Sequence, residues 1–256
     1  MYSEEHKKYL KEITKSNIIV RFTQVFVTLV VIFIWEFTTI KGIINPFIFS
    51  SPSRILTCFV DINFFPHIII TLIETLIAFF ASIFLGLLIS SILWSNNLLA
   101  RIFDPFLSIL NSLPKAALGP ILIIWCGANI KSIIIMSLLI SLFTCIINFY
   151  DSFKNTNIQM IILLKSFGAD KFMILKKLII PYNYKNIIST MKITSSMSLV
   201  DVIMGEMLVS KEGLEYLIVY SSQIFNLSLV IASIFILSII SYILYRIILL
   251  FENKVH

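Results

Sequence analysis

The chain has 256 residues, of which 58% are hydrophobic and only 13% are charged. Soluble domains carry about 45–50% apolar and about 25% charged residues, so this composition excludes an ordinary soluble protein and indicates several membrane crossings. The formal net charge of +6 is expected to set the orientation and to meet anionic lipid headgroups, and we expect no nucleic-acid partner.

No motif for metal, redox or nucleotide chemistry is found. The three cysteines and three histidines are scattered, without a CxxC motif or metal-ligand spacing. HExxH, paired-aspartate and serine-elbow motifs are missing, so we expect no catalytic residue, no metal site and no enzyme activity. Since no GxxxxGK[ST] phosphate loop occurs, we expect no cofactor in this chain and no ATP bound by it.

Apolar segments long enough to cross a membrane dominate the chain. A spanning helix needs about 20 mostly apolar residues, so we predict an all-α polytopic membrane protein with a single transmembrane domain over 1–256. The six predicted spans cover about 22–40, 68–93, 105–126, 131–149, 187–208 and 227–250. The first apolar run follows a basic segment but lacks a small-x-small cleavage site, so it is interpreted as a retained span.

The distribution of Lys and Arg predicts the orientation. With the N-terminus inside, fourteen Lys and Arg residues fall in inner segments and four in outer segments. Because basic residues accumulate on the cytoplasmic side, we expect both termini and the segment 150–186 in the cytoplasm.

The second predicted span carries small residues at intervals of four: Ala78, Ser82, Gly86 and Ser90. Small side chains let another helix approach closely. That helix could belong to the same chain or to a second subunit.

Polar groups interrupt the third and fifth predicted spans. Pro114 is expected to kink the third span. Lys115 falls near its middle, where a charge costs at least about 2.5 kcal/mol, so it should face a cavity or a carboxylate. The fifth span carries a polar stripe that indicates either hydrogen bonds between helices or one wall of a solute path: Thr190, Thr194, Ser198, Asp201 and Gly205. We hypothesise that Lys115 and Asp201 pair.

The segment 150–186 lies between two apolar segments and carries eight charged residues. A seventh span over 158–180 would place five of them in the bilayer at roughly 2.5–3.5 kcal/mol each, so we predict that this segment stays in water. We expect a short helix, a turn at Gly168 and a second helix that ends near Pro181. Gly168 permits a left-handed turn, and Asp170 can cap the second helix. Composition alone also allows a hairpin that lies on the membrane surface.

The same segment carries the residues of a family resemblance. Lys165-Ser166-Phe167-Gly168-Ala169-Asp170-Lys171-Phe172 leads to Ile180-Pro181. This order resembles the cytoplasmic motif of the permease subunits of binding-protein-dependent ABC importers, most closely the nitrate/sulfonate/taurine type. The family motif has Glu-Ala-Ala, then a glycine, then a closing Leu-Pro.

Further matches extend the resemblance over nearly the whole chain. They lie at 49–53, 113–127, 205–206 and 212–214. The sequence departs from the family where Ile162, Leu163 and Leu164 replace Glu-Ala-Ala, where Lys185 replaces a proline and where Glu215 replaces a glycine. The missing glutamate would ordinarily contact the ATPase, so the departures concern coupling more than the fold.

The resemblance implies the transmembrane subunit of an ATP-driven importer in the plasma membrane of a prokaryote. It implies cytoplasmic ABC ATPases that bind ATP, a second permease subunit in a homodimer, and an extracytoplasmic solute-binding protein. The family's solutes imply a small anionic or heterocyclic organic molecule, such as a sulfonate, nitrate or a vitamin precursor.

The resemblance also implies which residues act. The expected ATPase-coupling residues are Lys165, Ser166, Phe167, Gly168, Ala169, Asp170 and Pro181. The residues of the third and fifth spans, independently of the resemblance, give the positions expected to line the solute path or pack helices: Lys115, Thr194, Ser198, Asp201 and Gly205.

Two other classes of protein stay open. The first alternative is an ATP-independent secondary transporter or channel, which would work without a partner and would more often show internal repeats. The second is a membrane enzyme, which would need clustered His, Asp or Cys residues. Solute flux through the chain alone would support the first, and turnover without ATP would support the second.

Overall fold

The computed structural model of the chain describes residues 4–113, 115–209 and 211–253. These residues are mostly helical, and no strand occurs among them. The all-α polytopic fold expected from the sequence is therefore confirmed.

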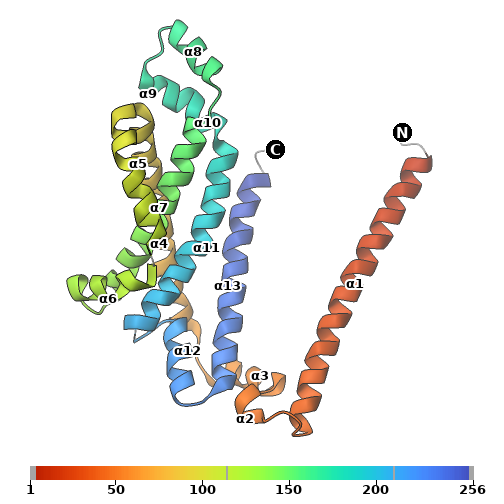
Figure 1. The fold of residues 1–256 in the computed structure, drawn as a ribbon. Coiled ribbons are helices and arrows are strands. Elements are labelled where there is room, and N and C mark those ends of the chain that lie inside the picture. The colour runs from red at the N-terminus through yellow and green to blue at the C-terminus, as the bar shows by residue number, and fades with distance from the viewer. Residues whose placement is uncertain (1–3, 114, 210, 254–256) are drawn as a thin grey trace. The chain divides into compact units, whose positions relative to one another are not determined.

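The chain divides into two units (Figure 1). The first unit comprises residues 1–62 and 221–232, with α1 (Glu4–Ile40), α2 (Pro46–Phe49) and α3 (Pro52–Asp61). The second unit comprises residues 63–220 and 233–256, with α4 (Phe65–Ser95), α5 (Asn97–Ser112), α6 (Lys115–Cys126), α7 (Ile130–Lys154), α8 (Ile158–Ser166), α9 (Lys171–Ile174), a π-helical turn (Leu175–Ile179), α10 (Ile180–Tyr182) and α11 (Tyr184–Val209). Residues of both units occur in α12 (Leu214–Gln223) and α13 (Leu227–Asn253).

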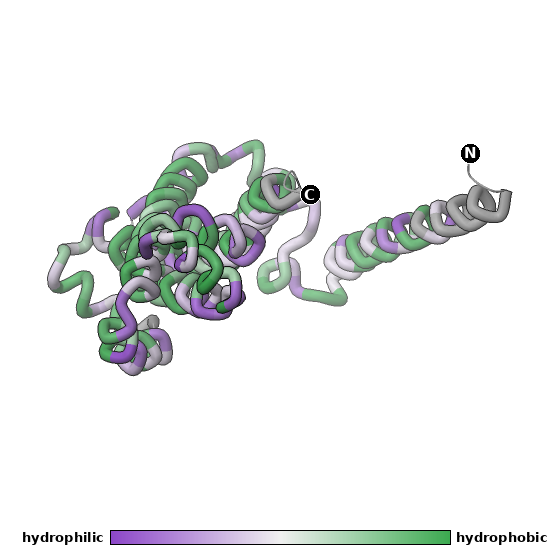
Figure 2. Tube along the Cα trace, turned by 90° about the horizontal axis from the view of Figure 1, so that it is seen from above, coloured by the Kyte–Doolittle hydropathy of each residue, from purple (hydrophilic) through white to green (hydrophobic). Residues whose placement is uncertain are grey.

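Five described helical segments are long and apolar enough to cross a membrane: Thr14–Ile40, Phe65–Ser95, Ile130–Lys154, Tyr184–Val209 and Leu227–Leu250. Each contains one predicted span. Hydrophobic residues, green in Figure 2, run along the helices of the second unit, with hydrophilic residues among them.

The predicted third span differs from a single kinked helix. Over this stretch the chain forms α5 and α6, which are bent by 102° at a short break. The pair gives a sixth span if both helices belong to one crossing. Pro114, expected to cause the kink, lies outside the described residues.

The core of the second unit lies where α4 packs on α7. The small residues of α4 are buried, and a Cβ added to Gly86 would lie 2.7 Å from the Cβ of Cys145. Ser82 Oγ donates to the carbonyl oxygen of Leu138 at 3.3 Å, and Ser90 Oγ to that of Ile146 at 3.0 Å. The small-residue stripe therefore serves close packing within this chain, as small residues do between membrane helices.

In the first unit, two short helices follow α1. Each begins with a proline, preceded by a capping side chain from Asn45 or Ser51, which fits the preference of proline for the first helical turn. Ser53 donates from its backbone N and its Oγ to the Glu36 carboxylate of α1, at 3.0 and 2.8 Å. The loop that the sequence marks by its prolines is thus ordered by local caps and one carboxylate.

Candidate functional site

The segment between α7 and α11 forms a helical hairpin at one end of the second unit (Figure 1). Asn157 Oδ1 accepts a hydrogen bond from Gln159 N at 2.9 Å and begins α8. Gly168 has φ +80° and ends α8 in a left-handed turn. Asp170 Oδ1 accepts a hydrogen bond from Met173 N at 2.8 Å and caps α9. The local structures predicted for Gly168 and Asp170 are therefore confirmed.

The second helix ends near Pro181, as predicted, because α10 ends at Tyr182 and Asn183 forms a turn. After α9 the chain forms the π-helical turn, in which Ile180 N donates to Leu175 O, and Pro181 lies inside α10. A proline in a regular α-helix loses one hydrogen bond and clashes with the preceding turn. The wider π turn just before it accommodates the proline, and the chain continues into α11 after a single turn at Asn183.

Asn183 is a structural residue that sequence reasoning missed. Its side-chain Nδ2 donates to Thr156 Oγ1 at 2.7 Å and to Ile179 O at 2.9 Å. Asn183 and Thr156 are both buried. They join the end of the hairpin to its beginning, and an Asn two residues after the proline was the available signal.

The base of the hairpin is anchored in the apolar core of the second unit. Ile161, Ile174 and Ile179 are buried in one cluster with Phe149 and Phe153 of α7. Interiors packed in this way move as bodies and do not deform continuously. The hairpin is therefore rigidly joined to the two spans that it connects.

The tip of the hairpin is open. Phe167 is 78% exposed, and Lys165, Ser166 and Asp170 are exposed as well. Ala169 differs, because it packs partly buried against the core cluster. The structure thus gathers the predicted coupling residues 165–170 around one turn, with an aromatic side chain projecting from it.

The polar stripe of α11 faces α7 inside the second unit. Ser141 Oγ lies 3.1 Å from Ser198 Oγ and donates to Asp201 Oδ2 at 3.0 Å. Thr194 Oγ1 lies 2.9 Å from Cys145 Sγ. All of these residues are buried, so the stripe holds the two helices together. Serines four apart in α7 were the signal that could have identified the partners.

Gly205 and Lys115 are the other two residues predicted to line the path or pack helices. A Cβ added to Gly205 would lie 2.8 Å from Cγ2 of Ile133, so this glycine allows close contact between α11 and α7. Lys115 begins α6, but its side chain lies outside the described part of the structure. The Lys115–Asp201 pair therefore stays a prediction.

A second polar network joins α4, α11 and the start of α12. Thr71 Oγ1 donates to Glu206 Oε1 at 2.6 Å and accepts from Leu214 N at 3.0 Å. Glu206 Oε2 accepts from Glu215 N at 2.9 Å. A carboxylate that binds the first amides of a helix stabilises that helix, so Glu206 fixes where α12 begins. Burial raises the pKa of the Glu215 carboxyl above its ordinary value.

Only a glycine fits at position 213, directly beside the Glu206 carboxylate. Its φ is +112°, and an added Cβ would overlap the carboxyl group of Glu206. Its backbone N donates to His67 Nδ1 at 3.1 Å.

Glu74, one turn after Thr71 on α4, is 1% exposed, and neither carboxyl oxygen has a hydrogen-bond partner among the described residues. Glu206 and Gly213 belong to the stretches that resemble the family, but their roles could not be predicted from the sequence.

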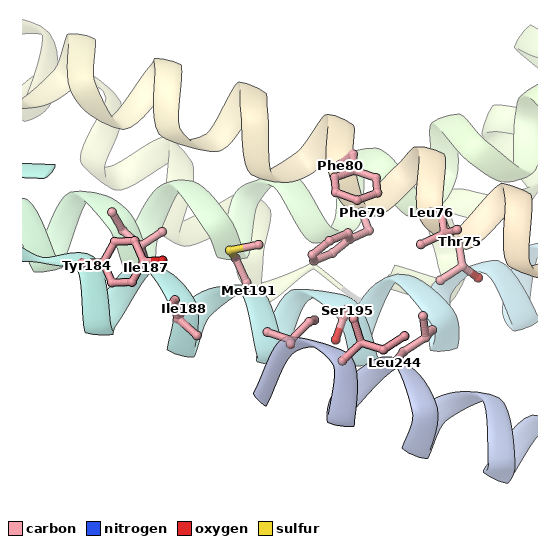
Figure 3. Close-up of a pocket in the computed structure, with 12 residues that line it drawn as sticks. Thr75, Leu76, Phe79, Phe80, Tyr184, Ile187, Ile188, Met191, Ser195 and Leu244 are labelled. Carbon is pink, nitrogen blue, oxygen red and sulfur yellow. The ribbon is translucent and has the colours of Figure 1, made fainter. Parts of the chain in front are cut away.

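An apolar pocket of about 320 Å³ opens between α4, α11 and α13. In Figure 3, Phe79 and Phe80 come from α4, Met191 and Ser195 from α11, and Leu244 from α13. The hydroxyls of Thr75 and Ser195 are both bonded to backbone carbonyls of their own helices. Apart from Tyr184, the other described residues that line the pocket are apolar, and none of the described lining residues is charged, so the pocket offers no charge to pair with a charged solute. Within the described ranges, no group of His, Cys, Asp and Glu is arranged to hold a metal ion.

These features define a polytopic membrane protein: several helices are long and apolar enough to span a membrane, and an exposed helical hairpin lies between two of them. Residues 78–256 match the family described as "Binding-protein-dependent transport system inner membrane component". The chain belongs to this family and is a permease of the ABC transporter class.

Similar proteins include several permeases. The chain is 31% identical to the formylaminopyrimidine transport permease protein ThiX of Halalkalibacterium halodurans, over 83% of this chain and 86% of that one. It is 22% identical to the putative aliphatic sulfonates transport permease protein SsuC of Bacillus subtilis, over 88% and 83%. It is 20% identical to the taurine transport system permease protein TauC of Escherichia coli, over 82% and 79%.

Solved structures with the same fold include an inward-facing MetNI methionine ABC transporter. The TM-score is 0.68 over 74% of this chain and 94% of that chain. Since the sequences are only 16% identical, the likeness concerns the fold alone.

Proposed function

We propose that this permease imports a small anionic or heterocyclic organic solute and that cytoplasmic ABC ATPases drive it through the hairpin 150–186. Both termini and the hairpin lie in the cytoplasm in this proposal, as the excess of Lys and Arg favours. A second copy of the chain completes the path, and an extracytoplasmic protein delivers the solute. The observation that carries the proposal is an exposed aromatic tip on a rigidly anchored base.

The tip supplies the contact. A side chain such as Phe167 that leaves water on binding is the kind of residue that dominates the free energy of an interface. Ile162 and Leu163, which replace the family's Glu and first Ala, are also exposed on α8. In this proposal the ATPase is held by apolar contacts where other members of the family use a glutamate.

The base supplies the coupling. Ile161 and Ile174 of the hairpin are buried with Phe153 of α7, and the π turn leads into α11. When the two ATPases close, a hairpin joined in this way would move α7 and α11 as a body. The hydrogen bonds of Ser141 with Ser198 and Asp201 would keep the two spans together during that movement.

The solute class rests on the relatives, whose names cite formylaminopyrimidine, aliphatic sulfonates and taurine. These are all small polar organic molecules. Thr194, Ser198, Asp201 and Gly205 act in this proposal by positioning α11 against α7, and Lys115 remains the proposed charged residue of the path.

The test is co-purification of the native ATPase with the permease in mild detergent. Phe167→Ala removes the apolar contact, and we expect a loss of affinity of about thirtyfold or more, equivalent to about 2 kcal/mol. Gly168→Pro cannot adopt φ +80° and should abolish binding. Trp125→Ala is the matched control, because Trp125 is 76% exposed on α6.

The outcomes separate the candidate functions. Loss of the ATPase from both hairpin variants, with retention in the control, supports the importer. A folded wild-type permease that retains no ATPase, or equal retention in all variants, would contradict coupling through the hairpin. Solute flux by the permease alone would then favour a secondary transporter or channel.

A further inference from the structure

A pocket of about 350 Å³ lies between the hairpin and the junction of α4 and α5. Lys165 and Lys171 line it from the hairpin, and Trp94, Ser95 and Asn96 line it from the end of α4. Lys171 Nζ donates to Ser95 O at 2.9 Å, so this charge is held at the wall of the pocket. The volume is within the range of pockets that bind small molecules.

The charges of the pocket are of one sign. None of its described lining residues is acidic. The nearest acid in sequence, Asp170, uses its carboxylate to cap α9 through Met173 N. The two lysines therefore present positive charge that no carboxylate of the lining neutralises, and an anion is the complementary ligand.

The floor of the pocket is apolar. Ile158, Ile161 and Ile174 line it, and the last two are buried in the core cluster. A ligand that fits both parts has an anionic head and a hydrocarbon tail. A free inorganic anion would leave the apolar part unused.

The pocket lies at the end of α4, a helix long enough to cross the whole bilayer. A helix rises about 1.5 Å per residue, so the 31 residues of α4 extend about 46 Å. Hydrocarbon and headgroups together are about 40–45 Å thick, which places the final residues of α4 among the headgroups. Trp94, next to the last residue, is of the type enriched at this interface.

We propose that this pocket binds the headgroup of an anionic glycerophospholipid, with Lys165 and Lys171 contacting its phosphate. Basic pockets of this kind on the cytoplasmic side of membrane helices suit such lipids. The inference rests on the proposed orientation, which assigns the pocket to the cytoplasmic leaflet. A lipid bound there would contact both the hairpin and the end of α4.

The test uses quenching of Trp94 fluorescence by brominated lipids. The chain has three tryptophans, so Trp35→Phe with Trp125→Phe leaves Trp94 as the only one. The permease alone is reconstituted into phosphatidylcholine vesicles that contain brominated phosphatidylglycerol or, at equal mole fraction, brominated phosphatidylcholine. We expect stronger quenching by the brominated phosphatidylglycerol.

Charge variants identify the pocket as the source of that preference. Lys165→Gln with Lys171→Gln should lower the preference for phosphatidylglycerol by about thirtyfold, at about 1 kcal/mol for each lysine. Lys165→Arg with Lys171→Arg should retain it, which excludes misfolding as the cause of a loss at these positions. Lys176→Gln with Lys177→Gln removes the same charge from the hairpin outside the pocket and should also retain the preference.

Four results would overturn the proposal. Equal quenching by both lipids, or equal loss in both Gln pairs, would mean that no specific headgroup site exists. Removal of the preference by soluble glycerol phosphate would assign the pocket to a free phosphate ester. Loss of ATPase co-purification in the Lys165/Lys171 Gln pair, with unchanged quenching, would assign the pocket to the ATPase.

The quenching is measured without the ATPase, so a failure of the importer proposal does not alter it. Protease protection of the hairpin in sealed vesicles tests the orientation separately.

Discussion

Gly213→Ala should destabilise the permease more than Gly168→Ala does. Both glycines have a positive φ, but only at Gly213 would an added Cβ overlap a neighbouring side chain. A side chain at φ +112° costs about 1–3 kcal/mol in backbone strain alone. The added Cβ would also displace the Glu206 carboxylate from Thr71 Oγ1 and Glu215 N, at about 1 kcal/mol for each hydrogen bond. We therefore expect a total loss of about 3–5 kcal/mol.

Gly168→Ala is the matched control. Gly168 has φ +80°, but no described atom lies within 4 Å of an added Cβ. Only the strain remains, so we expect a loss of about 1–2 kcal/mol. The difference between the two variants therefore isolates the close approach of Gly213 to Glu206.

The assay is thermal unfolding in detergent, followed with a thiol-reactive dye. Of the three free cysteines, Cys58 and Cys145 are buried and react only when the structure opens, whereas Cys126 is partly exposed and is replaced by serine in every variant. At about 2–4 °C for each kcal/mol in chains of this size, Gly213→Ala should lower the midpoint by about 10 °C and Gly168→Ala by a few degrees. Equal midpoints for the two variants would refute the role assigned to the Glu206 network.

Two further changes test the packing and the charge of the second unit. Gly86→Leu should lower the free energy of unfolding by about 1–3 kcal/mol or more, because the new side chain meets Cys145. Leu88→Ala, on an exposed face of α4, should change that free energy by less than about 0.5 kcal/mol. The same dye assay measures both, and equal effects would contradict close packing of α4 on α7. Burial raises the pKa of Glu215, so its contribution to stability is full below the ordinary pKa of glutamate and is lost as the pH rises through the raised value. Glu215→Gln should therefore flatten this fall in unfolding midpoint toward neutral pH, and an unchanged pH profile would show that Glu215 does not cause it.

The spans could be predicted from the sequence because burial in lipid requires long apolar runs, and such runs are visible in any window of the chain. The turn of the hairpin could be predicted for a similar reason. Gly168 and Asp170 act through bonds to residues only a few positions away. Local chemistry was sufficient in both cases.

The polar networks could not be predicted in the same way. Thr71 and Glu206 are 135 positions apart, and Gly213 and His67 are 146 apart. Nothing in either segment alone specifies its partner. The stripe on α11 was visible as a pattern, but its meaning depended on whether Ser137 and Ser141 of α7 faced it.

The π-helical turn before Pro181 is another feature that the sequence does not predict. The rule that proline ends a helix assumes α-helical hydrogen bonding on its N-terminal side. Here the turn before the proline has π-helical bonding, with Ile180 N bound to Leu175 O, and the helix ends at Tyr182, one residue after the proline. No residue type in that turn indicates the switch from α-helical to π-helical hydrogen bonding.

The most direct test of the account is a crosslink from the tip of the hairpin to the ATPase. Phe167 is replaced by the photoreactive benzoylphenylalanine, and Trp125 is replaced in the same way as the control. Irradiation of membranes that contain the whole transporter should join position 167, and not position 125, to the ATPase. A crosslink from position 125 alone, or none from position 167 while the ATPase is bound, would contradict docking at this hairpin.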